Sequence, residues 1–146
     1  MDDLAGRSIR TRHGFGRVLV FVYGVFAVAA TGRSTLQLAT QASEAPVPYA
    51  LSAFAAVVYL VATYALATGR RTLALGAVGI ELAGVLLVGV TSLLLPQEYP
   101  DATVWSDFGA GYGFVPLVLP VAGLWWLLRG SRDEDDPGPG AETRRA

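Results

Sequence analysis

The near absence of charge from the middle of the chain is the feature that most constrains its fold. Positions 18–128 carry only eight Asp, Glu or Arg residues, whereas the much shorter ends, 1–17 and 129–146, together carry fifteen. The hydrocarbon core of a bilayer tolerates few charges, and 53% of the 146 residues are apolar. The pattern therefore predicts a membrane-spanning middle with polar ends and argues against an ordinary soluble domain.

Four apolar segments are long enough to cross a bilayer. A spanning helix needs about 20 mostly apolar residues, because about 30 Å of hydrocarbon is crossed at about 1.5 Å per residue. Such segments lie at 18–38, 47–68, 72–95 and 112–128, and the outer loop at 96–111 is the longest connection between them. The three residues between the second and third segments allow only a tight helical hairpin. The predicted fold class is all-α, an integral membrane bundle of four antiparallel transmembrane helices.

The distribution of arginine predicts the orientation. Ten of the eleven arginines lie on one side of the membrane if both termini are cytoplasmic, and only Arg33 lies on the other side. Since basic residues in short loops are retained inside, we expect a multi-pass protein of the plasma (inner) membrane with both termini cytoplasmic. Residues 1–17 then form a basic arm and residues 129–146 a disordered acidic tail. A cleavable signal peptide in the first segment, with Ala27 and Ala29 at the cleavage site, is an alternative that the sequence leaves open.

Residue types that support much catalytic and metal chemistry are scarce. The chain has no Cys, and its single His, His13, lies in the basic arm. This composition excludes disulfides and thiolate chemistry and argues against a Cys- or His-based metal site. No nucleophile, base and metal constellation is visible, so neither an enzymatic activity nor a cofactor is predicted. The arginines are spread over two ends and one hairpin, so no nucleic-acid partner is predicted.

Glu81 is the most informative residue, because an ionisable side chain in a spanning helix is costly. It lies nine residues past the start of its segment, about 13–14 Å into the membrane. Small residues at helical spacing around it predict that it faces the bundle interior. Tyr59 comes to the same depth in an antiparallel hairpin, so a protonated Glu81 bonded to Tyr59 is favoured over an ion pair with Arg33. The predicted intramembrane polar cluster consists of Glu81, Tyr59, Thr63 and Tyr23.

The outer loop at 96–111 is the second distinctive stretch. Its aromatic residues, including Trp105, are expected to anchor the chain at the headgroup level. Its carboxylates could instead gather a hard cation, although three acidic residues across ten positions are weak evidence and no metal is predicted. In the fourth segment, Pro116 and Pro120 predict a kink. The possible outer-face site consists of Glu98, Asp101, Asp107 and Trp105.

Three stretches carry a family resemblance: GRSTLQLAT, EAPVPYALSAFAAVVYLVAT and VWSDFGAGYGFVPLVLPV. Together they resemble a family of uncharacterised small four-helix integral membrane proteins of high-GC actinobacteria, over most of positions 15–128. The resemblance implies a four-helix inner-membrane protein. It carries over no catalytic or binding residue, because no activity is assigned to that family.

Three classes of function fit these observations. The leading one is a structural or accessory membrane component that acts through helix packing, against a membrane protein partner or a second copy of itself in the lipid bilayer. The alternative is a small proton-coupled transporter or carrier centred on Glu81. An intramembrane enzyme comes third, because it would need several convergent polar groups at one depth.

Overall fold

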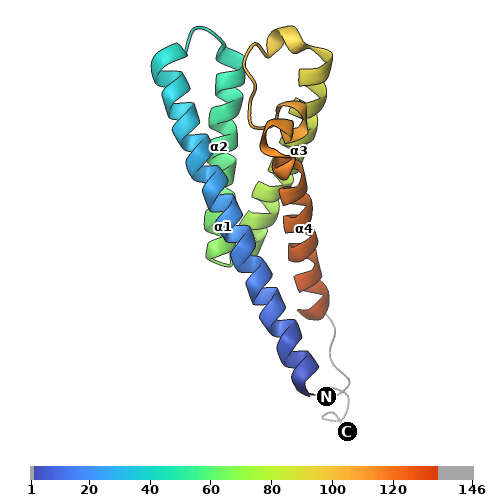
Figure 1. The fold of residues 1–146 in the computed structure, drawn as a ribbon. Helices are drawn as coiled ribbons and strands as arrows, with labels where there is room; N and C mark the ends of the chain where they lie inside the picture. Colours follow the sequence, from blue (N-terminus) through green and yellow to red (C-terminus); the bar gives the residue numbers. More distant parts are fainter. Residues whose placement is uncertain (1, 135–146) are drawn as a thin grey trace.

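The computed structural model describes residues 2–134, and this part of the chain is helical without strands. In Figure 1 the start of α1, the α2–α3 turn and the end of α4 lie toward one end of the bundle, and the α1–α2 connection lies at the other. α1 packs along α2, α2 along α3, and α3 along α4. The helices are α1 (Asp2–Gln41), α2 (Pro46–Ala67), α3 (Arg71–Leu94), the short 3₁₀ helices η1 (Pro96–Glu98) and η2 (Ser106–Tyr112), and α4 (Val115–Glu134).

Three of these helices are long and apolar enough to cross a membrane: His13–Gln41 within α1, Pro46–Ala67 and Arg71–Leu94. A fourth crossing exists only if η2 and the following helix are taken together, and the two are bent by 101°. The three apolar helices indicate a membrane protein, and the all-α class is confirmed. Four separate straight spans are not confirmed, because the fourth crossing consists of η2 and α4, which do not form one continuous helix.

The predicted hairpin between the second and third segments is confirmed. α2 ends at Ala67, and the backbone N–H of Arg70 donates to the carbonyl of Ala65 at 2.9 Å, which satisfies one of the free carbonyls at the helix end. Gly69 has a φ of 68° at this reversal, a left-handed conformation that glycine adopts without steric cost. α3 then starts at Arg71.

The two polar ends differ from the prediction. α1 begins at Asp2, so the basic arm continues the first spanning helix instead of forming a separate segment. α4 continues to Glu134, so the prediction of disorder is wrong for positions 129–134. The rest of the predicted acidic tail, 135–146, lies outside the described residues.

The bundle interior is built from small and aromatic residues. The predicted inward face of α3 is confirmed, since Ala74, Val78 and Val85 are at most 1% exposed. Large apolar side chains cover the outside, such as Phe21 at 71% exposure and Val28 at 76%. An apolar outer surface around a close-packed interior is the arrangement expected for helices in lipid.

The connection between α3 and α4 folds back into the bundle. We call residues 99–114 the inserted segment, and Figure 1 shows it, in orange, beside α3 before α4 begins. Thr103 through Ser106 are buried, and the Trp105 ring lies against Gly84. Gly84 precedes the end of α3 at Leu94 by ten residues, about 15 Å along the helix. The Trp105 ring therefore reaches roughly the middle of the bundle, and burial in protein makes the non-helical backbone that carries it tolerable.

Left-handed backbone conformations produce this reversal. Asp107, Phe108 and Phe114 have φ values of 51°, 58° and 60°, which non-glycine residues adopt uncommonly. Conformations of this kind persist only where surrounding contacts hold them. Because α4 begins at Val115, Pro116 lies in its first turn, and only Pro120 falls in the helix interior.

Candidate functional site

The buried centre of the bundle is a hydrogen bond between two helices. The Tyr23 hydroxyl of α1 donates to Glu81 Oε2 of α3 at 2.6 Å. Both side chains are 0% exposed. The site also abuts α4, since a Cβ added at Gly123 would lie 3.5 Å from the Tyr23 hydroxyl. Among residues 2–134, Glu81 Oε1 has no hydrogen-bond partner.

A second hydrogen bond adjoins the first. Trp105 Nε1 of the inserted segment donates to the Tyr59 hydroxyl of α2 at 3.1 Å. The Tyr59 ring centroid lies 6.2 Å from that of Tyr23 and 6.4 Å from that of Trp105. We call Glu81, Tyr23, Tyr59 and Trp105 the Glu81 centre. Its members come from α1, α2, α3 and the inserted segment, so it joins four parts of the chain.

The predicted polar cluster is assembled with different partners. The expectation that Tyr59 bonds to Glu81 is wrong, because Tyr23 is the donor to Glu81 and Tyr59 accepts from Trp105. Thr63 turns to its own helix, where its hydroxyl donates to the Tyr59 carbonyl at 2.7 Å. The prediction that Glu81 faces the interior is confirmed by its burial.

The position of Trp105 overturns the expectation of a headgroup anchor. The side chain is 1% exposed and lies inside the bundle. Two glycines of α3 provide the space for the inserted segment: Gly84 lies against the Trp105 ring and Gly89 against the Phe108 ring. A glycine on the inward face of a helix can be recognised in the sequence, but the sequence does not show which distant ring packs against it.

A methyl group at Gly84 is expected to loosen the inserted segment. The added carbon would lie 2.6 Å from the Trp105 ring, so the ring or the backbone must move, at a cost of about 1–3 kcal/mol. An added carbon at Gly79 on the same helix meets no atom within 4 Å, so Gly79→Ala is the matched control. An SDS titration in mixed micelles, followed by circular dichroism, measures both. Equal destabilisation by the two substitutions would contradict the proposed steric effect.

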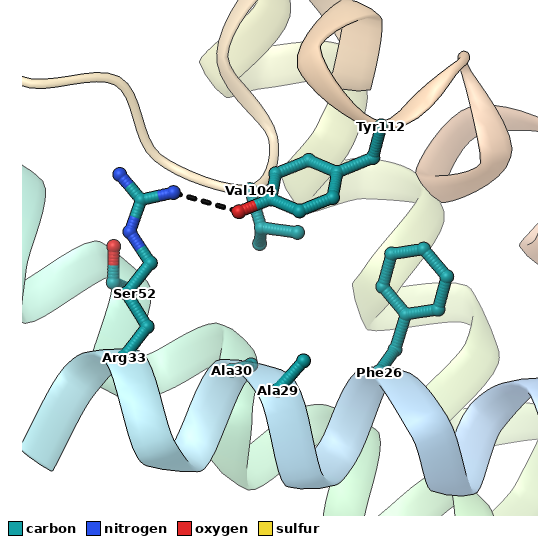
Figure 2. A pocket seen from close by; sticks show the side chains of 7 residues that line it. All are labelled: Phe26, Ala29, Ala30, Arg33, Ser52, Val104 and Tyr112. Carbon is teal, nitrogen blue, oxygen red and sulfur yellow. Dashed lines mark hydrogen bonds between the residues drawn. The ribbon is translucent and has the colours of Figure 1, made fainter.

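A small cavity lies between α1, α2 and the inserted segment. Its volume is about 20 Å³, enough for about one water molecule. Ser52 Oγ lines it and is buried, with no hydrogen-bond partner in the part of the chain that the structure describes. Figure 2 shows the lining residues, with Arg33 pointing toward Tyr112 across the cavity. They are Phe26, Ala29, Ala30, Arg33, Ser52, Val104 and Tyr112.

Arg33 ties α1 to the inserted segment. Its Nη1 donates to the Tyr112 hydroxyl at 2.7 Å, and its Nη2 donates to the carbonyl of Ala102. These two bonds hold the Arg33 guanidinium against the inserted segment. The Phe26 ring connects this contact to the Glu81 centre, since its centroid lies 6.0 Å from that of Tyr112 and 5.5 Å from that of Tyr59.

The acidic residues of the possible outer-face site have separate surroundings. Asp101 accepts a hydrogen bond from the Tyr49 hydroxyl at 2.6 Å. The backbone N–H of Asp107 donates to Ser92 Oγ at 2.9 Å, and Glu98 is exposed in η1. Within the described residues, 2–134, no three His, Cys, Asp or Glu side chains gather where they could hold a metal ion. The structure thus does not bring Glu98, Asp101, Asp107 and Trp105 into one site.

No protein-family model, curated protein or solved structure matches the chain.

Proposed function

We propose that this protein is a structural or accessory component of the plasma membrane that acts through helix packing and has no enzymatic activity of its own. The observation that carries the proposal is the complete burial of Glu81, at 0% exposure, together with that of its donor Tyr23. A carboxyl group on a transport path must be reached by water from one side of the membrane. A sealed pair instead joins α1 to α3 by a hydrogen bond across the bundle, which is an established use of polar residues between membrane helices.

The exposed surface gives the protein a way to meet a partner. Gly32 of α1 is exposed and has no atom within 4 Å of an added Cβ. Small residues on a lipid-facing helix let another backbone approach closely. The proposed partner is a membrane protein or a second copy of the chain. In the proposed orientation both termini lie in the cytoplasm, together with most of the arginines.

A small proton-coupled carrier centred on Glu81 is the second candidate. Two observations favour it: Glu81 Oε1 has no hydrogen-bond partner within residues 2–134, and the chain bends by 101° between η2 and α4. Discontinuous helices near the membrane midplane are typical of transporter binding sites. In this candidate the inserted segment would open to admit water to Glu81.

Infrared spectroscopy of Glu81 in lipid separates the two candidates. The difference between wild type and Glu81→Gln isolates the carboxyl band of Glu81 from the other acids. For a sealed contact we expect a protonated band that does not change between about pH 5 and pH 9, because desolvation disfavours the charged form. Glu98 is the matched control, since its side chain is exposed and its band is isolated in the same way with Glu98→Gln.

A Glu81 band that titrates in this range would overturn the structural proposal. It would show that protons reach the midplane, as the carrier requires. Proton uptake into vesicles containing the protein then provides the second measurement, since a carrier loses this flux in Glu81→Gln. A structural protein shows no difference between the wild type and this variant.

A further inference from the structure

A groove runs along the surface between α2 and α3, separate from the Glu81 centre. Its volume is about 610 Å³. Most of its lining is apolar, and residues one helical turn apart on each helix contribute, such as Val57 and Val61 on α2 and Gly76 and Ile80 on α3. Val57 is 56% exposed and Ile80 is 50% exposed. The groove therefore opens toward the surroundings of the bundle.

The length of the groove matches one leaflet of a bilayer. It extends along α3 from Arg70, at the α2–α3 turn, to Ile80. Ten residues of helix cover about 15 Å, which is half of a hydrocarbon core of about 30 Å. Gly76 lies between these ends, and an added Cβ there would meet no atom within 4 Å. The glycine leaves the floor of the groove open for a chain of methylene groups.

The end of the groove at the α2–α3 turn is positively charged. Arg70 lines it there and is exposed, and Thr72 adds a hydroxyl group. The Arg70 guanidinium carbon lies 5.5 Å from the centroid of the Tyr64 ring, so the charge lies against α2, one of the two helices that form the groove. Basic groups at the ends of interhelical grooves bind the headgroups of anionic lipids.

We propose that this groove binds one acyl chain of an anionic phospholipid, from the leaflet on the side of the α2–α3 turn, with the headgroup phosphate at Arg70. A second copy of the chain fits less well. A two-fold interface applies the same surface patch twice, and copies related by an axis along the membrane normal would bring their Arg70 side chains to the same depth. A phosphate is complementary to that charge. This inference goes beyond the proposed function and depends only on the helices being in a membrane.

Native mass spectrometry of the full-length protein tests the proposal. The protein is released from nanodiscs that contain equal amounts of phosphatidylglycerol and phosphatidylcholine, and the retained lipids are counted. We expect the wild type to retain about fivefold more phosphatidylglycerol, because one basic side chain contributes about 1 kcal/mol near an anionic headgroup. Arg70→Gln should bring the two lipids close to parity. Arg129→Gln is its control, since Arg129 stacks on Trp125 of α4, with its guanidinium carbon 4.3 Å from the ring centroid, and does not line the groove.

Filling the groove tests where the acyl chain lies. Gly76→Leu should reduce retention of both lipids, whereas Gly79→Leu, which has equal free space but does not line the groove, should retain them as the wild type does. Equal retention of the two lipids by the wild type would overturn the proposal, and so would equal losses in the two leucine variants. Dimers that carry no lipid and dissociate in Gly76→Leu would also overturn it, because the occupant would then be a second copy. Arg70→Gln keeps the test valid if a leucine variant does not fold, since Arg70 lies in the exposed turn.

Discussion

Trp105→Ala is expected to lower the free energy of unfolding by about 3–5 kcal/mol, the largest effect of a single substitution in this protein. The ring is 1% exposed, and its Nε1 donates to Tyr59. Removal leaves a cavity beside Gly84, which has no side chain to fill it, and leaves the Tyr59 hydroxyl without its donor. An SDS titration in mixed micelles, followed by circular dichroism, gives the difference.

Trp125→Ala is the matched control for this experiment. Trp125 is 50% exposed on α4, so its contacts with lipid or detergent are similar before and after unfolding. We expect a loss below about 1 kcal/mol, mainly from the cation–π contact with Arg129. If the two alanine variants lose similar stability, Trp105 does not hold the inserted segment in the bundle.

The Tyr23–Glu81 hydrogen bond should give the second large effect, as a coupling between two substitutions. Tyr23→Phe removes the only donor to Glu81 among residues 2–134, and Glu81→Leu leaves the Tyr23 hydroxyl buried without an acceptor. Each substitution is expected to cost about 1–3 kcal/mol. The double variant has neither unsatisfied group, so its loss should be smaller than the sum by about 0.6–1.7 kcal/mol.

Glu81→Gln provides the conservative control in the same titration. An amide oxygen still accepts from Tyr23, so we expect a smaller loss than in Glu81→Leu. Strictly additive effects of Tyr23→Phe and Glu81→Leu would contradict the coupling. A loss in Glu81→Gln as large as in Glu81→Leu would show that the hydrogen bond is not what the site contributes.

Much of the helical architecture could be predicted from local sequence. The boundaries of α2 and α3 follow from long apolar runs, interrupted in α3 by Glu81, and from the Gly69 turn, where glycine allows a positive φ. The burial of Glu81 followed from the small residues around it on the same helical face, a pattern that depends only on 3.6 residues per turn. Both signals are contained within one helix or one hairpin.

The partners of the buried groups could not be predicted in the same way. Tyr23 and Tyr59 both lie within reach of Glu81 by sequence spacing, and the packing of α1 on α2 and of α2 on α3 decides between them. Trp105 is equally suited to a headgroup region and to an interhelical space, since its ring is apolar and its N–H is polar. The left-handed turns at Asp107 and Phe108 that carry it inward have no strong sequence signal, because residues other than glycine rarely adopt them.

The sequence by itself determined that the chain forms apolar helices, that two of them make a hairpin, and that one carries an inward glutamate, because periodicity and hydropathy act within a helix. The tertiary structure alone decided that the segment before α4 enters the bundle, that Trp105 fills the space at Gly84, and that Tyr23 donates to Glu81. These contacts join residues far apart in the chain. Their selection depends on which of several chemically similar neighbours the packed helices bring within hydrogen-bonding distance.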